Sequence, residues 1–436
     1  MIVRARRRAA GARALTTLGA TAVAATVALA SAAPARAQPT GAWLDLVARG
    51  SSTQAPPSWL DGGTGRLVHG DDPDSWQGTA IGEAQLGADW RATPRLAFHL
   101  HARARAQEDD GGRPVGVVEA WAALLAMPVL GVSQARVRAG AFILPTSREN
   151  IEPLWTSPYT LTLSALNSWI GEEVRPLGVL AEYERDPGEE HGWRTGFSLF
   201  GGNDTAGALL AWRGWTMGDR LTTIGETLPL PALPSLGPGG PFAEQDRDGT
   251  TPFRGDLDGR PGWAGYLRYR YSGLARVVVT HYDNRGDREL HHGEYAWDTD
   301  FDQLGLELFP ATGWTVAGEH LRGRTRMGVP TPRADADFAA SYLLLSWQHE
   351  DVRATVRWDR FSTDDRDHLA TGERSDEGGH AWTAALLWQA TPTLGVGVEY
   401  VDVHATRPAL NGPGSRDDGG RSVTLGLRYR IGTAAG

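Results

Sequence analysis

The sequence of 436 residues contains no cysteine and no lysine, so that all 43 of its basic residues are arginine. Without cysteine there are no disulfide bonds and no thiolate-ligated metal or iron–sulfur site. Beyond residue 37 there is no apolar run of about 20 residues, which excludes a bundle of membrane-spanning helices. The chain is nevertheless 41% apolar and contains 17 tryptophans. This composition is too hydrophobic for a disordered chain, and a folded protein is expected.

The N-terminus has the pattern of a targeting segment. Five arginines occur in the first 13 residues, an Ala/Val/Thr/Leu-rich stretch covers 14–33, and Ala35-Arg36-Ala37 follows. This pattern predicts a signal peptide cleaved after Ala37; an uncleaved membrane anchor is the alternative. Cleavage leaves 37 arginines against 52 acidic residues. So acidic an exported chain argues against a nucleic-acid partner.

The rest of the chain alternates with a period of two residues. From 95 to 107 the sequence reads RLAFHLHARARAQ, with apolar side chains on one face and arginine or histidine on the other. In the last segment, one face is wholly apolar from Val423 to Ile431 and the other is small or charged. Successive side chains of a strand point to opposite sides, so these segments are predicted two-sided strands. A tilted strand of about 9–11 residues is long enough to cross a bilayer.

Sixteen such segments are found, although a less strict count allows 14 or 18. They cover 42–50, 79–90, 95–106, 117–126, 134–143, 178–185, 193–201, 263–271, 274–283, 300–309, 313–324, 338–349, 352–361, 380–390, 394–404 and 421–431. Short and long connections alternate between them, as they do between the periplasmic turns and extracellular loops of outer-membrane barrels. We therefore predict that 38–436 forms an all-β, transmembrane antiparallel barrel in the outer membrane of a Gram-negative bacterium.

This pattern resembles that of porins, and most of all the phosphate-selective (porin O/P-like) family. The likeness extends over the whole mature chain and includes a local run, Gly140-x-Phe142-x-x-Pro145-x-Ser147-x-Glu149. The resemblance implies a water-filled channel that assembles as a homotrimer, with outer-membrane lipid and lipopolysaccharide as its surroundings.

The loop at 144–177 is too apolar to be a solvated external loop. Because an exposed apolar patch of this size is costly, we expect the loop to fold into the barrel as a constriction; packing against a neighbouring subunit is the alternative. Charged side chains at a narrow pore decide which ions pass. The candidate constriction residues are Arg148, Glu149, Glu152, Glu172, Glu173 and Arg175.

Basic side chains recur on the strand faces assigned to the lumen. A series of guanidinium groups would attract anions, because arginine offers several donors suited to carboxylate or phosphate. The alternative is structural, with these arginines paired to carboxylates such as Glu83, Glu182 and Asp359. The candidate pore-lining residues are Arg95, His99, Arg103, Arg105, Arg136, Arg138, Arg268, Arg270, Arg353, Arg357, Arg428 and Arg430.

The segment 202–262 is predicted to be a long extracellular loop. Five prolines between 229 and 241 argue for irregular structure there. Acidic residues in this and other loops could hold divalent cations that bridge lipopolysaccharide, although solvated loops explain them as well. The stretch 246–259 weakly resembles a calcium loop but lacks the EF-hand spacing, and neither a metal site nor a cofactor is predicted.

The function predicted from these features is passive diffusion of small polar solutes through a porin, with a bias toward anions. A surface-binding or adhesive barrel that acts through its long acidic loops is the main alternative. An outer-membrane hydrolase is a weaker one, because no G-x-S-x-G, H-E-x-x-H or P-loop motif occurs. The protein is therefore predicted not to be an enzyme.

Overall fold

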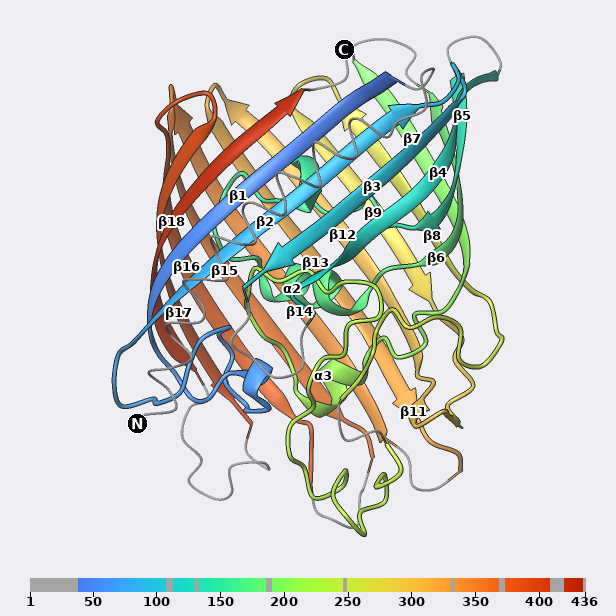
Figure 1. The fold of residues 1–436 in the computed structure, drawn as a ribbon, viewed down its shortest axis with the longest axis vertical. Helices are drawn as coiled ribbons and strands as arrows, with labels where there is room; N and C mark the ends of the chain where they lie inside the picture. Colours follow the sequence, from blue (N-terminus) through green and yellow to red (C-terminus); the bar gives the residue numbers. More distant parts are fainter. Residues whose placement is uncertain are drawn as a thin grey trace.

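The computed structural model is a closed antiparallel β-barrel of sixteen strands with helical segments inside it (Figure 1). It describes residues 38–106, 113–129, 133–185, 190–245, 249–330, 334–367, 373–407 and 419–433. The predicted signal peptide at 1–37 lies outside the described residues.

Each of the sixteen predicted strands is present, so the predicted fold class is confirmed. The barrel strands are β1 (Gln38–Gln54), β2 (Gln77–Arg91), β3 (Leu96–Arg105), β4 (Val115–Val129), β5 (Ser133–Ala141), β6 (Leu177–Arg185), β7 (His191–Gly201), β8 (Gly262–Tyr271), β9 (Ala275–Asp283), β12 (Asp298–Ala311), β13 (Trp314–Met327), β14 (Ala334–His349), β15 (Val352–Asp365), β16 (Glu377–Gln389), β17 (Leu394–Thr406) and β18 (Gly420–Thr433). Two further short strands, β10 (Leu290–His291) and β11 (Glu294–Tyr295), pair with each other outside the barrel sheet.

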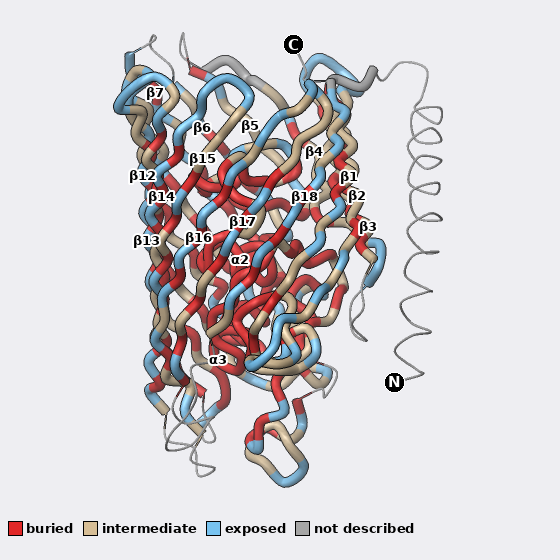
Figure 2. Tube along the Cα trace, turned by 90° about the vertical axis from the view of Figure 1, so that its left-hand side faces the viewer, coloured by how far each residue is buried: buried red, intermediate tan, exposed pale blue. Residues whose placement is uncertain are grey.

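Neighbours in the sequence are neighbours in the sheet, and the first strand closes the barrel on the last. In the β1–β18 pair, for example, Leu46 lies opposite Tyr429. Side chains alternate between the two faces, as the buried and exposed positions along the strands in Figure 2 illustrate. On β18, Val423, Leu425 and Leu427 are exposed on the outside. An apolar outer face is what a bilayer requires of a barrel wall.

The two ends of the barrel differ in the length of their connections. At one end, where β1 begins and β18 ends, β12 and β13 are joined by residues 312–313, and β14 and β15 by 350–351. Gly313 has a φ of 79°, and a Cβ there would lie 2.4 Å from the Gln348 carbonyl oxygen, so this tight turn requires glycine. At the other end the connections 55–76, 142–176 and 202–261 are long. We call these the short-turn end and the long-loop end.

Aromatic side chains gather on the outer surface near the short-turn end. Eight aromatic residues belong to this group. Seven of them are exposed: Tyr183, Trp193, Tyr271, Trp314, Trp347, Trp388 and Tyr429. The eighth, Trp90, stacks on Phe98 with a ring distance of 5.3 Å. Such side chains favour the border between lipid and water.

The interior of the barrel contains a hydrophobic core instead of an empty lumen (Figure 2). At its centre is Trp169 of helix α2 (Ala165–Glu173), which is 1% exposed. Its ring lies 5.4 Å from Phe301 of β12 and 5.3 Å from Phe338 of β14, and it also meets Trp215 edge-on at 6.0 Å. The core therefore attaches two long segments to the barrel wall, namely 142–176 and the first part of 202–261, which we call the inward segments. Among the described residues, no helix has both the length and the apolar composition needed to cross a membrane.

We predict that Trp169→Ala releases the inward segments without opening the barrel. Removal of a buried tryptophan costs about 3–5 kcal/mol, and the cross-strand hydrogen bonds are untouched by it. Trypsin should then cleave faster after Arg213 and Arg220, which are buried in the wild type. The matched control is Trp388→Ala, whose side chain is 51% exposed on the outer surface. Equal cleavage rates in both variants and the wild type would contradict the role of this core.

Candidate functional site: the barrel interior

The loop between β5 and β6, expected as the constriction, lies inside the barrel. It contains the short helix η2 (Pro153–Trp155) and the helix α2. Figure 1 shows α2 about halfway along the barrel. Its apolar side chains Leu163, Leu166 and Ile170 are buried. The long apolar content of this loop is thus explained by packing in the interior.

Carboxylates on the strand faces hold this loop by its backbone. A buried N–H group needs an acceptor, and an ionised carboxylate is a strong one. Strands from different sides of the barrel contribute. The donor and acceptor pairs are Ile143 N–H with Glu119 of β4 (2.8 Å), Arg148 N–H with Glu319 of β13, Leu161 N–H with Glu399 of β17 (2.7 Å) and Ala165 N–H with Asp359 of β15 (3.2 Å).

Arg357 of β15 connects the wall to the loop through a fully buried network. Its guanidinium donates to Glu149 at 2.6 Å and to Asp359 at 2.8 Å. It also donates to the carbonyl oxygens of Thr162 at 2.7 Å and Leu163 at 3.1 Å. With all these partners inside the protein, Arg357 fixes the position of the loop and is not available to a solute.

The first part of 202–261 also lies inside the barrel, although the whole segment was expected to be extracellular. Helix α3 (Ala208–Trp212) and the following Trp215 are buried. Trp215 donates through its indole N–H to the carbonyl oxygen of Ser362 on β15 at 2.9 Å. Arg213 pairs with Glu172 of α2 at 2.6 Å. Apolar and ion-paired contacts with α2 and the wall thus draw this segment inward.

The six candidate constriction residues do not form one ring. Glu172 and Glu173 belong to α2, where Glu172 pairs with Arg213 and Glu173 accepts from the Trp169 indole at 2.6 Å. Arg175 donates to the Gly171 carbonyl oxygen at 3.1 Å. Elsewhere in the loop, Glu149 is bound to Arg357, Arg148 lies 3.8 Å from Glu307, and Glu152 pairs with Arg430 at 2.7 Å.

Two cavities follow the wall made by β1, β2, β17 and β18. The larger, about 370 Å³, opens toward the short-turn end, and the smaller, about 40 Å³, lies toward the long-loop end. Both are lined by Arg49, Leu161 and Asp219. These three residues therefore form the neck between the cavities.

Charge is balanced at the neck. Arg49 of β1 forms an ion pair with Asp219, and Arg105 of β3 bridges Asp219 at 3.0 Å and Glu83 at 3.2 Å. His69 lines the smaller cavity, and burial together with the nearby Arg105 and Arg49 cations lowers its pKa to about 3. His69 is therefore neutral at physiological pH.

Leu161 reaches the neck because two glycines leave room for it. Gly397 of β17 lies opposite Gly426 of β18. A Cβ at either position would lie 3.1 Å from a methyl group of Leu161. Larger side chains at these positions would push the tip of the loop away from the wall.

Several of the candidate pore-lining residues are paired within the wall. Arg103 lies 3.5 Å from Glu226, and His99 contacts Asp89 at 2.7 Å. Arg430 donates to both oxygens of Asp45 at 2.6 Å, with Arg428 3.6 Å from the same carboxylate. Two more candidates lie near the short-turn end: Arg353 over the Tyr159 ring at 5.1 Å, and Arg95 exposed in the turn before β3.

The arginine wall is a second group on the lumen faces of β5 to β9, together with Arg148 of the inward loop. It consists of Arg136, Arg138, Arg148, Arg194, Arg268, Arg270 and Arg276. In the register of the sheet, Arg194 lies opposite Arg268, and Arg270 lies opposite Arg276. Like charges in directly opposed positions destabilise a sheet.

Three glutamates offset part of this positive charge. Glu182 pairs with Arg138 at 2.7 Å, Glu184 with Arg194 at 2.7 Å, and Glu307 with Arg276 at 3.1 Å. Arg276 keeps 46% of its side chain exposed. The wall is therefore a partly solvated surface with an excess of positive charge near the short-turn end.

Some of the residues that matter here were not among the candidates. Asp45 and Arg49 share one face of a predicted strand, and Glu307, Glu319 and Glu399 each belong to another predicted strand. The alternation along these strands could have identified all five as facing the lumen. Asp219 gave no such signal, because it belongs to an irregular segment.

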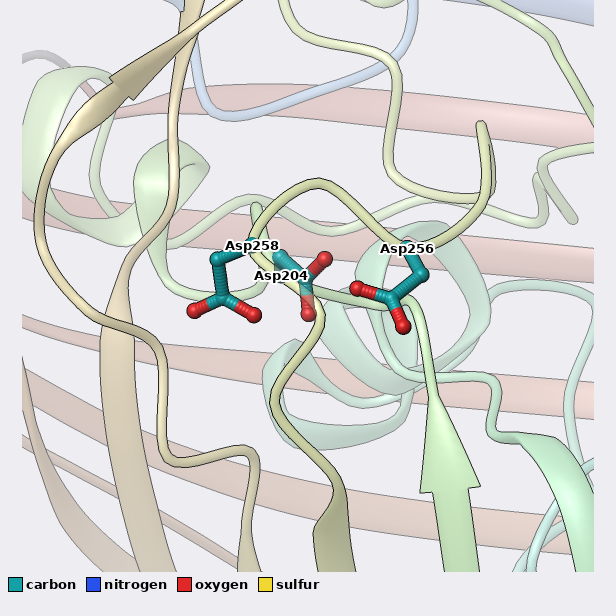
Figure 3. A group of neighbouring side chains, drawn as sticks. All are labelled: Asp204, Asp256 and Asp258. Carbon is teal, nitrogen blue, oxygen red and sulfur yellow. The ribbon is translucent and has the colours of Figure 1, made fainter.

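Three carboxylates from the 202–261 segment meet beside the end of β7. The ligand oxygens of Asp204, Asp256 and Asp258 all lie within 4.8 Å of one another (Figure 3). Oxygen donors of this kind are those that Ca²⁺ prefers. Burial raises the pKa of Asp204 to about 7, and the charges of Asp258, Asp256 and Asp287 add to the shift, against the Leu257 N–H that donates to it.

The fold has close counterparts among solved structures, whereas no protein-family model and no curated protein sequence matches the chain. The outer membrane channel DcaP of Acinetobacter baumannii matches with a TM-score of 0.52 and 8% identity, over 92% of this chain and 99% of that chain. The anion-selective porin from Comamonas acidovorans gives 0.50 and 11%, over 91% and 100%. OmpF of Salmonella typhi, in complex with daunomycin, gives 0.49 and 11%, over 89% and 97%. At these identities, the first two relate the chain to outer-membrane porins by fold.

We predict that Arg357→Met lowers the free energy of unfolding by about 3–5 kcal/mol, because it leaves Glu149 and Asp359 buried without their cation. Glu149→Gln in the same background should recover part of the loss, which a double-mutant cycle from urea titrations in lipid vesicles would measure. The control is Arg374→Met, since the Arg374–Asp376 pair lies at the surface and such pairs add little to stability. Additive effects of Arg357→Met and Glu149→Gln would contradict the coupling.

We also predict that the loop around Asp204 becomes less stable as the pH rises from about 4 to about 7. The folded state, with its raised pKa, binds a proton more tightly than the unfolded state in this range, so stability is lost as that proton leaves. Asp204→Asn should abolish the pH dependence of the protection factors in 202–207 and 254–260, which are the hydrogen-exchange rates corrected for intrinsic exchange at each pH. Asp74→Asn, in another loop, should leave it unchanged. An unaltered profile in Asp204→Asn would refute the assignment.

Proposed function

We propose that the protein is an outer-membrane porin, which forms a water-filled channel for passive diffusion of small polar solutes. The outer faces of the strands are apolar and carry exposed aromatic residues near the short-turn end, which suits a bilayer. The interior contains polar cavities joined at a neck of Arg49, Leu161 and Asp219. This combination of an apolar outside and a polar passage supports a channel.

We further propose that the channel favours anions, and the arginine wall is the observation that carries this proposal. Arg268 is repelled by Arg148 and Arg194, and the Glu182 carboxylate attracts it. A solute anion entering from the short-turn end would relieve this repulsion and accept guanidinium hydrogen bonds. The same donors suit carboxylate and phosphate, so the phosphate preference implied by the sequence resemblance is a narrower form of this proposal.

The neck explains how such a channel would restrict size. Its two charged residues are paired, and Leu161 projects between them and the glycines of β17 and β18. Selection by charge would therefore occur at the arginine wall, and selection by size at the neck. Assembly as a homotrimer and contact with lipopolysaccharide belong to the same proposal, and cross-linking in native membranes would test the trimer.

The test is a reversal-potential measurement in a planar bilayer under a KCl gradient. Wild-type channels should pass Cl⁻ more readily than K⁺, and the double variant R268E/R270E should shift the potential toward cation preference. Arg322→Glu is the matched control, because Arg322 is an exposed arginine on the outer face of β13. Absence of conductance would refute the channel, and a cation-selective wild type would refute the anion preference.

A further inference from the structure

A row of basic and polar side chains crosses the outer surface of five adjacent strands, β13 to β17. In the register of the sheet, His320 lies opposite Ser341, Ser341 opposite Arg360, Arg360 opposite His380, and His380 opposite His404. His320, Arg360 and His380 are exposed. The imidazole rings of His380 and His404 stack with a centroid distance of 5.2 Å. We call these five residues the outer row.

The outer row marks a border on the barrel surface. Toward the short-turn end, the next outward side chains on β14 and β16 are apolar and exposed, namely Leu343 at 56% and Trp382 at 52%, whereas the next one on β17 is Asp402. Toward the long-loop end, arginine and aspartate alternate in ion pairs. Arg324 donates to Asp335 at 2.7 and 2.8 Å, and Arg326 lies 2.8 Å from Asp298. On β14 to β16 the row therefore separates an apolar band from a zone of paired charges.

Arg360 differs from the arginines in the paired zone. In the part of the chain that the structure describes, no carboxylate forms an ion pair with it, and its registered neighbours are Ser341 and His380. Asp402 lies 3.4 Å from His404 and is shared with Arg421. An arginine on the lipid face costs about 2–4 kcal/mol at the middle of a bilayer but only about 0–1 near its surface. The position of Arg360 thus places the row at the level of the lipid headgroups.

We propose that the outer row binds the phosphate group of an anionic lipid. Arg360 can donate two parallel hydrogen bonds to phosphate oxygens, and the N–H groups of His320 and His380 and the Ser341 hydroxyl lie on either side of it. The exposed Leu343 and Trp382 below the row would pack against the acyl chains. This combination fits a phosphorylated lipid better than free phosphate, which would gain nothing from the apolar surface. The proposal rests on the membrane location within the proposed function, but not on conduction.

The experiment is native mass spectrometry of the detergent-solubilised full-length protein with phosphatidic acid or phosphatidylcholine. Wild-type protein should retain phosphatidic acid, and Arg360→Gln should bind it about tenfold or more weakly, as expected for lost hydrogen bonds to a charged group. The matched control, Arg326→Gln, removes an outward arginine of the paired zone and should bind as the wild type does. The His380→Gln variant should show a smaller loss.

Other outcomes would overturn the proposal. Equal retention of phosphatidylcholine, whose phosphate is neutralised by choline, would mean that the surface binds lipid without selecting an anionic headgroup. Displacement of phosphatidic acid by inorganic phosphate at equal concentration would assign the row to free anions. Unchanged binding of phosphatidic acid in Arg360→Gln would show that the outer row is not the binding site. The conductance of Arg360→Gln in a planar bilayer should equal that of the wild type, so a failure of the channel proposal would be seen separately.

Discussion

The closure of β1 on β18 is the constraint on which the rest of the structure depends. In a bilayer, an unpaired backbone N–H or C=O group has no water to bond, so a sheet must have no free edge. Once the sheet is closed, every strand has one face toward lipid and one toward the interior. The outer face must then be apolar, and the charged residues of the strands collect inside, where they need partners. The inward loop, the paired arginines and the arginine wall are all consequences of this division.

The interior satisfies these charges in two different ways. On one part of the wall, Glu319, Asp359 and Glu399 accept hydrogen bonds from the backbone of the inward loop, and Arg357 donates to it. The loop is thus bound by groups that would otherwise be buried without partners. On the lumen faces of β5 to β9, the arginines that the structure describes outnumber the glutamates paired with them, so positive charge predominates among these residues. The bound loop narrows the interior of the barrel, and the arginines give the remaining space a positive charge.

The outside of the barrel is also divided. The aromatic residues near the short-turn end and the outer row of His320, Ser341, Arg360, His380 and His404 enclose an apolar band between them. Beyond the outer row, toward the long-loop end, Arg324 and Arg326 form ion pairs with aspartates. This order follows the change from hydrocarbon to headgroup to water, and it connects the lipid surface to the proposed phosphate site without involving the passage inside.

The sequence by itself determined the strands and their faces, because a strand repeats every two residues and the alternation is visible in the order of residues. It therefore predicted the sixteen strands and the inward direction of Arg103, Arg138 and Arg357. Only the tertiary structure decided which arginines form ion pairs within the protein, because partners such as Glu149 and Arg357 are 208 residues apart in the sequence. The same holds for 202–261, whose irregular backbone gives no periodic signal. Its entry into the barrel depends on Trp215 and Arg213 meeting α2 and the wall, a packing that no local pattern encodes.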